Sequence, residues 1–469
     1  MSDSLPILMK CPPPLEPNFV PAALWNRAFR ERVAAAGGGR PFGIALEQPD
    51  GTVSTFETEI LPADAAGAGE LSFRTVERLV KFLLWQRGGC RIHLGGDPEI
   101  ASRIAALYAP GGAREFDYHF MGEKAYLRPL EIVSVPFEEL PSANEAAVDL
   151  GGHLDGCRIG FDLGGSDRKC AAVIDGEVVF SEEVPWDPYF QSDPDYHLEG
   201  IRHSLQRAAE HLPRIDAIGG SAAGVYVNNE VRVASLFRGV PDDVFEQKVR
   251  RMFLDLQAEW NNVPFVIVND GDVTALAGSM ATGDTGVLGV AMGTSEAVGF
   301  VNPEGHITTW LNELAFAPID YQENGPADEW SGGIGVGAQY LSQQAVGRLA
   351  SRAGYEFPAD MPLPERLIAV QVAMENGEQG AARIFETIGR YFGYAVAHYA
   401  DTYDIRQILA LGRVTSGSGG DLLLKEAKEV LATEFPELAE RIQFRQPGEK
   451  EKRHGQAIAA ASLPETKQS

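Results

Sequence analysis

Two glycine-containing segments of this chain have the composition of loops that bind phosphate. The first is Asp162-Leu163-Gly164-Gly165-Ser166, with Lys169 shortly after it, and the second is Gly293-Thr294-Ser295. Glycines let a backbone approach phosphate oxygens without an intervening Cβ, and free N–H groups and a serine hydroxyl can donate to those oxygens. Each segment alone could equally be an ordinary hairpin turn. Their combination is what indicates a site that holds phosphate from two sides.

Two aspartates stand where strands of this chain are expected to end. The apolar run 263–268 is followed by Asn269-Asp270, and the carboxyl ends of buried strands are where α/β folds bind ligands. Asp270 could take the proton from an attacking hydroxyl. Its structural alternative is a turn or cap residue, and Asp272 is expected to be the N-cap of the next helix. Asp162 is costly to bury unless it is paired, and Mg²⁺ held through water is a natural partner.

A further segment could accommodate a flat ring such as adenine. The run QILALGRVTSGSGGDLLL predicts a strand that ends at Gly412 and a loop of small residues that leads into a helix. Such a loop leaves space beside a helix N-terminus, which suits polar groups. On its own this pattern is weak.

The elements that carry these residues follow a repeated pattern. Residues 158–184 predict a strand, a turn, a strand, the hairpin turn Asp175-Gly176 and another strand, and residues 286–310 predict the same order with a turn at 303–305. This repetition indicates a duplicated lobe. A fainter copy begins at Pro41 and has a hairpin turn at 49–51 but no phosphate loop. Helices are expected at 195–212 and 241–260.

Strands that alternate with helices favour α/β layers throughout the chain. We expect residues 1–150 to form a separate α/β domain of unknown role, joined to the rest by the polar stretch 142–156. Residues 155–283 should form a first lobe and residues 284–453 a second. The tail of small residues at 454–463 predicts a closing helix that completes the first lobe.

Composition narrows the classes of function. The 469 residues have 44% hydrophobic and 23% charged content, as in an ordinary soluble globular protein, and no apolar run approaches the length of a membrane span. The formal net charge of −26 disfavours a nucleic-acid partner. The four cysteines show neither zinc-binding nor disulfide spacing and are expected to be reduced and mostly buried. The N-terminus lacks a signal-peptide pattern, so a cytoplasmic protein is expected.

Residues 155 to 462 resemble the actin-like ATPase superfamily, and within it the ROK group of bacterial sugar kinases and regulators. DLGGS is similar to the group's D-x-G-G-T phosphate loop, and VNDGDVTALAG to its E-N-D-A-N-A-A-A-L-G segment. GVAMGTSEAVGFVNPEGHI is similar to the second phosphate loop, LALGRVTSGSGG to the adenosine loop and HGQAIAAASL to the closing helix. The resemblance implies a two-lobed actin-like (ribonuclease-H-like) fold that binds ATP and Mg²⁺, with Asp270 as the catalytic base.

The sequence also departs from the group's pattern. No C-x-C-G-x-x-G-C zinc motif is present, so no zinc site is expected, and Phe316 stands where the zinc-binding His would be. We expect Trp330 and Phe316 to pack together in place of the metal. Glu313 matches the group's sugar-contacting Glu, but the Asn of the sugar loop is missing, and Arg413 replaces a glycine of the adenosine loop. Ser221 and Asn269 could still face the substrate.

Three hypotheses follow. The first is a kinase that transfers the γ-phosphoryl group of ATP to a hydroxyl of a sugar or sugar-like substrate. The second is a non-catalytic sensor or scaffold that keeps the ligand cleft. The third is an ATPase switch without an acceptor. The N-terminal strands argue against the DNA-binding winged helix of ROK regulators, and the extra domain could cover the cleft or mediate contacts in a homodimer.

Overall fold

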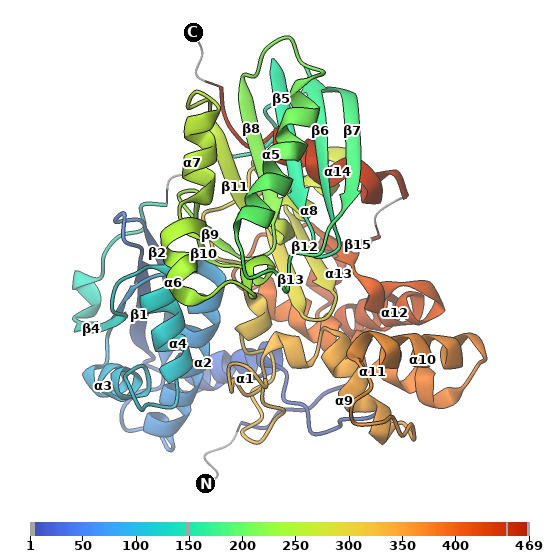
Figure 1. Cartoon of the computed structure of the whole chain (residues 1–469). Helices are drawn as coiled ribbons and strands as arrows, with labels where there is room; N and C mark the ends of the chain where they lie inside the picture. The colour runs from blue at the N-terminus through green and yellow to red at the C-terminus, as the bar shows by residue number, and fades with distance from the viewer. Residues whose placement is uncertain (1–4, 146–149, 447–448, 467–469) are drawn as a thin grey trace.

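The computed structural model describes residues 5–145, 150–446 and 449–466, without the side chains of 449–454. The first lobe is built on a five-stranded sheet of order β11-β8-β5-β6-β7 (Figure 1). Its strands are β5 (Cys157–Leu163), β6 (Asp167–Ile174), β7 (Glu177–Pro185), β8 (Ala217–Ala222) and β11 (Phe265–Asn269). β5, β8 and β11 run parallel, and the β5–β6–β7 meander is antiparallel. Helices α5 (Asp195–Ala209) and α7 (Met252–Glu259) belong to the same lobe.

The second lobe repeats most of this topology. Its sheet has the order β13-β12-β14-β15, with β12 (Val287–Met292), β13 (Glu296–Val301), β14 (Gln407–Leu411) and β15 (Gln443–Arg445). β12 pairs antiparallel with β13 and parallel with β14, as β5 does with β6 and β8. The expected strand after Gly305 is reduced to one bridge between Val301 and Ile307. Helices α9 (Gln343–Arg352), α10 (Leu363–Glu375), α11 (Gln379–Tyr399), α12 (Gly417–Glu434) and α13 (Pro436–Arg441) belong to this lobe.

Helix α8 (Asp270–Thr282) and the C-terminal helix α14 (Glu449–Ala461) connect the two halves. α14 packs on β5, β6, β8 and α8, which places the end of the chain in the first lobe (Figure 1). Glycine is required beneath it, because a Cβ on Gly160 or Gly219 would lie 1.7 Å from the Ala457 or Ala460 carbonyl oxygen. Two small residues of the sheet thus let a helix backbone lie directly on its face.

The N-terminal residues form an α/β unit with its own sheet, of order β2-β1-β3-β4. The strands are β1 (Arg40–Glu47), β2 (Val53–Ile60), β3 (Arg91–Gly95) and β4 (Glu131–Val135), and the main helices are α1 (Ala22–Ala36), α2 (Ala68–Arg87), α3 (Pro98–Leu107) and α4 (Glu115–His119). The predicted hairpin turn at 49–51 is confirmed. The unit is nevertheless not a third copy of the lobe, because β3 runs antiparallel to β1, whereas β8 and β14 run parallel to their partners.

The N-terminal unit is packed tightly against the second lobe. One continuous hydrophobic core contains Phe82 and Trp85 of α2 together with Phe392 and Tyr399 of α11. Around it, buried Glu16 pairs with Arg348 and Arg352 of α9. The view in Figure 1 shows the N-terminal unit beside the helices of the second lobe. Shared burial of this kind makes the unit part of the lobe's core.

Several local expectations are confirmed and others are wrong. Asp175 and Gly176 form the predicted turn of the β6–β7 hairpin, both with positive φ. The four cysteines are free, and three of them are buried. The single helix expected at 241–260 is instead broken into α6 (Asp242–Val244), the π-helical turn Phe245–Val249 and α7. Among the described helices, none is long and apolar enough to cross a membrane.

Candidate active site between the two lobes

The start of α8 carries the candidate base. Asn269 ends β11 and is the N-cap of the helix, because its side-chain oxygen accepts a hydrogen bond from the Gly271 N–H at 2.7 Å. Asp270 is the first helical residue and is partly exposed. The expectation that Asp272 caps this helix is wrong. Asp272 lies inside the first turn, is 5% exposed and accepts hydrogen bonds from other segments.

The Asn269 side chain is also satisfied on its other side, since its Nδ2 donates to the Gly224 carbonyl at 2.9 Å. Both ends of the amide are therefore engaged within the protein. Ser221 of β8 is likewise fully buried, and its hydroxyl donates to Oδ1 of Asp162 at 2.7 Å. The expectation that Ser221 faces a substrate is not met, because the side chain has no exposed surface. Its contact orients Asp162.

Asp162 lies close enough to Asp270 for its charge to affect the titration of Asp270. Burial raises the pKa of Asp270 to about 6, and the charge of Asp162 adds to the rise. Burial also raises the pKa of Asp162, against the effect of Ser221 and Lys169. Glu313 belongs to the same group, because burial and then the charge of Asp270 raise its pKa to about 7. Three carboxyl groups from β5, α8 and the segment after β13 thus share one site.

The first glycine loop follows Asp162 directly. Lys169 lies 3.6 Å from Asp162 Oδ2 and 3.2 Å from Asp167 Oδ1, so it connects the loop to the carboxylates. The Ser166 hydroxyl donates to Asp167 Oδ2 at 2.9 Å. Neither Gly164 nor Gly165 has a positive φ, so backbone conformation does not require glycine at either position. At Gly165 the reason for glycine is the lack of space for a Cβ.

Aromatic residues after β7 support this loop from outside. A Cβ on Gly165 would lie 2.0 Å from the hydroxyl oxygen of Tyr189. The Trp186 indole N–H donates to the Gly164 carbonyl at 2.7 Å. Larger residues at position 165 would therefore displace Tyr189 or the loop itself. The loop conformation depends on a neighbour that local sequence does not reveal.

The second glycine loop lies at the tip of the β12–β13 hairpin. The Gly293 N–H donates to the Ser295 carbonyl at 3.0 Å, which closes the turn around Thr294. Gly412, at the end of β14, has φ 92° and would place a Cβ 2.4 Å from the Met292 carbonyl oxygen. The structure thus brings the candidate adenosine loop directly against the residue before Gly293. Arg413 is exposed.

The base of α8 holds the two hairpins in a fixed relation. A Cβ on Gly271 would lie 2.6 Å from the Val298 carbonyl oxygen, and one on Gly299 would lie 2.1 Å from the Gly271 carbonyl oxygen. β13 therefore lies against the residue that follows Asp270. Since Asp270 also interacts with Asp162, the start of α8 lies between the first-lobe hairpin and the second-lobe hairpin.

Glu313 is held by a network that was not apparent from the sequence. Asn312 has φ 53°, and its Nδ2 donates to Asp272 Oδ1 at 2.9 Å, while its Oδ1 accepts from the Tyr403 hydroxyl at 2.8 Å. The N–H groups of Asn312 and Glu313 donate to the carbonyls of Gln86 and Trp85, at the end of α2. Carbonyls of a helix's last turn lack partners within the helix, so α2 has acceptors to offer here.

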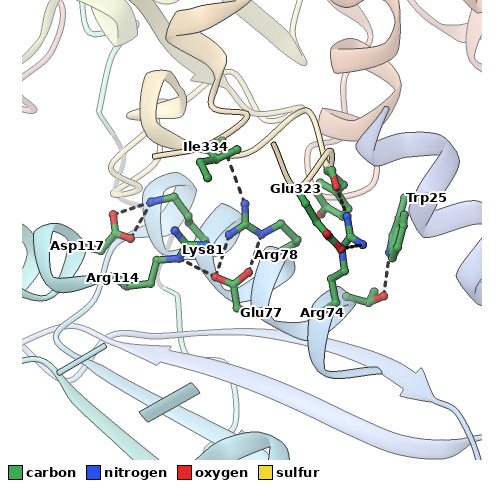
Figure 2. A network of polar contacts seen from close by, with 11 residues as sticks. Trp25, Arg74, Glu77, Arg78, Lys81, Arg114, Asp117, Glu323 and Ile334 are labelled. Atoms are coloured by element: carbon green, nitrogen blue, oxygen red, sulfur yellow. Dashed lines mark hydrogen bonds and ion pairs between the residues drawn. The ribbon is translucent and has the colours of Figure 1, made fainter. Parts of the chain in front are cut away.

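The same helix holds the segment that stands in place of the zinc loop (Figure 2). Arg74 donates to the Tyr321 carbonyl and pairs with Glu323. Arg78 reaches the Ile334 carbonyl at 3.4 Å and pairs with Glu77. One turn further along, Lys81 and Asp117 form an ion pair in which both side chains are 2% exposed.

The predicted packing of Phe316 with Trp330 is confirmed, with ring centroids 5.3 Å apart. The pair belongs to a larger aromatic cluster in which Phe316 also contacts Trp85 of α2 and Trp330 contacts Phe116 of α4. Sequence reasoning missed the residues of the N-terminal unit. The sequence hinted at them only by the high density of aromatic and charged residues in 73–87 and 114–120. That composition alone does not say which residues these side chains contact.

Comparison with solved structures places this arrangement in a known architecture. No protein-family model and no curated protein matches the sequence. The ROK hexokinase from Thermus thermophilus superposes over 66% of this chain and 97% of its own, with a TM-score of 0.53 and 19% identity. A ROK family transcriptional regulator, a homologue of the E. coli MLC protein, superposes over 66% of this chain and 79% of its own, with a TM-score of 0.52 and 17% identity.

The chain has the ROK fold. A hexokinase and a regulator share this architecture, so the fold does not by itself choose between catalysis and sensing. The site residues must make that choice. Asp162, Asp270 and Glu313 lie together as described, whereas Asn269 and Ser221 are engaged inside the protein.

Proposed function

We propose that the chain is an ATP-dependent kinase that phosphorylates a hydroxyl of a sugar or sugar-like acceptor, with Asp270 as the general base. The observation that carries the proposal is the position of Asp270 at the start of α8. It is partly exposed, interacts with Asp162, and has a pKa raised by burial to about 6. A base whose pKa lies just below neutral pH is deprotonated in the cell, yet basic enough to accept a hydroxyl proton.

The roles of the other residues follow from their places. N–H groups of Gly164, Gly165 and Ser166, and of Gly293 and Thr294, would donate to phosphate oxygens, with Lys169 as a nearby cation. Gly412 would leave space for the adenosine. Glu313, beside Asp270, would accept hydrogen bonds from acceptor hydroxyls. Most of the rate enhancement would come from positioning and charge stabilisation.

The carboxylates also fit Mg²⁺. Asp162 and Asp270 repel each other in a buried setting, and a divalent cation held by oxygen ligands or through water would relieve that repulsion. We propose Asp162 as the residue that holds it. When bound, Mg²⁺ would neutralise charge that develops on the transferred phosphoryl group.

A second candidate, a non-catalytic sensor or scaffold, is favoured by one observation. Two of the three side chains expected to contact the acceptor, Asn269 and Ser221, form hydrogen bonds inside the protein. A cleft that has lost acceptor contacts could still bind nucleotide or sugar without turnover. The third possibility, an ATPase switch, would release phosphate steadily without any acceptor.

An ATP-dependent phosphorylation screen over monosaccharides, disaccharides and polyols separates the three. The Asp270→Asn variant should lose turnover by roughly 10²–10⁴-fold, the usual contribution of a general base. Asp421→Asn, at an exposed position on α12, is the matched control and should behave as the wild type. Nucleotide binding without turnover on any acceptor would favour the sensor, and turnover that is independent of Asp270 would reject the assigned role.

A further inference from the structure

A cavity of about 570 Å³ lies next to the candidate base, and three parts of the chain line it. The first lobe contributes Asn269 and the β9–β10 hairpin, formed by β9 (Val225–Val227) and β10 (Glu230–Val233). The second lobe contributes 308–311. The N-terminal unit contributes Gln48, Pro49 and Asp50, which form the turn between β1 and β2.

The cavity adjoins the site of chemistry through the residues on either side of Asp270. Asn269 immediately precedes Asp270, and Asp272 of the same helical turn is also at the cavity wall. Tyr226 lines the cavity too, and the charge of Asp270 reaches its phenol, whose pKa is raised by burial first and by that charge second. An acceptor hydroxyl at Asp270 would therefore leave the rest of its molecule directed into this space.

The size of the cavity exceeds the needs of a single sugar ring. At about 30 Å³ for each water in the liquid, it corresponds to roughly 19 water volumes, more than the atoms of one pyranose ring occupy. The lining combines aromatic surface, at Tyr226 and Trp310, with amide and hydroxyl groups, at Gln48, Asn228 and Thr309. Aromatic surface with a few directed polar groups is the composition of a specific small-molecule site.

The outer wall is fixed to the rest of the protein. Gln48 Nε2 donates to the Arg87 carbonyl at 3.2 Å and to the Thr309 carbonyl at 3.4 Å, so the turn of the N-terminal unit is bonded to the second-lobe segment. Opposite it, Asn228 is exposed at the tip of the β9–β10 hairpin with φ 53°. Within the described part of the chain, its side-chain amide has no hydrogen-bond partner, which leaves it available to a ligand.

We infer that the acceptor is a disaccharide, with its reacting ring at Asp270 and its second ring between Asn228 and the Gln48–Asp50 turn. The inference rests on the proposed kinase function. It gives the N-terminal unit a part in acceptor selection, because a chain without that unit would lack this wall.

Two variants change the cavity without touching the proposed catalytic residues. Asn228→Gly removes the free amide at a positive-φ position that glycine adopts readily. Thr309→Trp fills the cavity from an exposed position. The matched control is Asn262→Gly, because Asn262 also has φ 53° and is exposed but does not line the cavity.

The experiment compares kcat/KM for maltose, cellobiose, sucrose and trehalose with that for glucose and fructose. We expect at least one disaccharide to be used at least tenfold better than the monosaccharides. Asn228→Gly should lower that value about tenfold, Thr309→Trp should abolish it, and Asn262→Gly should leave it unchanged. Monosaccharide turnover should be the same in all four proteins. Exclusive use of monosaccharides, or equal loss on both substrate classes, would overturn the inference.

Calorimetric titration of the same disaccharides in the presence of a non-hydrolysable ATP analogue separates this inference from the proposed function. If nothing is phosphorylated but a disaccharide binds and Asn228→Gly weakens it, the kinase assignment fails and the disaccharide site stands. If no disaccharide binds to the wild type, the site is rejected even where a monosaccharide is phosphorylated.

Discussion

The backbone N–H of Glu313 donates to the carbonyl of Trp85 at 3.0 Å. This bond joins a carboxylate of the candidate site to the last turn of a helix from the N-terminal unit. Beside it, the N–H of Asn312 donates a second hydrogen bond to the Gln86 carbonyl at 2.9 Å. Together they explain how the segment that carries Glu313 is ordered. The N-terminal unit therefore helps to position a carboxylate of the candidate site.

This arrangement predicts that Arg74 affects the acceptor more than the nucleotide. Arg74 pairs with Glu323, lies over the Trp25 ring and donates to the Tyr321 carbonyl. Arg74→Gln should loosen the segment that follows Glu313 and raise the KM for the acceptor roughly three- to tenfold, about the net value of one typical hydrogen bond. The KM for ATP should be unchanged in steady-state assays.

Arg103 provides the control for Arg74. It also pairs with a glutamate, Glu70, at 3.0 Å and lies over an aromatic ring, that of Phe73, but it makes no contact with the segment 320–336. Arg103→Gln should therefore leave both KM values unchanged. Faster hydrogen exchange at residues 313–336 in the Arg74 variant alone would report the loosening without any need for activity. Equal effects of the two variants would contradict the positioning role.

The pH dependence of the reaction should report the carboxylates of the site. A general base acts in its deprotonated form, so kcat/KM should fall about tenfold for each pH unit below a pKa near 6 and level off above it. Because Asp270 and Glu313 interact, the apparent value belongs to the pair. Initial rates between pH 4.5 and 8.5 test this. A flat profile through pH 6 would mean that no carboxylate with a raised pKa acts as base.

Asp272 should make the folded state less stable as the pH rises. Burial raises its pKa to about 8, against an ordinary value near 3.8, so between these values the folded state binds a proton that the unfolded state has lost. The free energy of unfolding then falls with pH by at most about 1.4 kcal/mol per unit from this group. Asp272→Asn keeps an oxygen for the Asn312 amide and should flatten the slope between pH 5 and 8.

Denaturant unfolding at several pH values measures this slope. Some slope will remain in the variant, because burial also raises the pKa of Glu296 to about 8. Asp404→Asn, at an exposed position, should keep the full wild-type slope. If the Asp272 and Asp404 variants have the same pH dependence, the folded protein does not hold Asp272 in its neutral form.

Local sequence was sufficient for the hairpins and insufficient for the contacts between distant segments. The turns at Gly51 and Gly176 require a positive φ, and glycine is the residue type that adopts it most readily. Both turns were therefore predicted from the sequence. The start of α8 was misplaced because Asn269 and Asp272 are both good capping residues. Their roles are decided by Phe300 and Asn312, which bind Asp272 from other parts of the chain.

The same limit applies to the N-terminal unit. Its strands and helices were visible as patterns, but its attachment to the second lobe depends on Trp85, whose partners in that lobe are more than 200 residues away. The sequence pattern also missed a second constraint on the first phosphate loop. Gly165 is needed because Tyr189 approaches it, and no spacing rule connects these two residues.

The two phosphate loops should respond differently to alanine. At Gly165 a Cβ would lie 2.0 Å from the Tyr189 hydroxyl oxygen, so Gly165→Ala should lower the melting temperature as well as nucleotide affinity. At Gly293 the nearest atom to a Cβ is the Ser295 carbonyl oxygen at 3.6 Å, an ordinary contact, and φ is not positive. Gly293→Ala should therefore melt like the wild type.

Nucleotide titration of Gly293→Ala is the decisive measurement. A loop that meets phosphate oxygens through its backbone has no room for a methyl group in the complex, so affinity for ATP should fall about tenfold or more although the fold is intact. Gly305→Ala is unsuitable as a control because Gly305 has φ 94°, whereas Gly69→Ala, in open space on α2, is suitable. Unchanged ATP affinity in Gly293→Ala would mean that the β12–β13 hairpin does not contact the nucleotide. The hypothesis that loops from both lobes bind the phosphates would then be rejected.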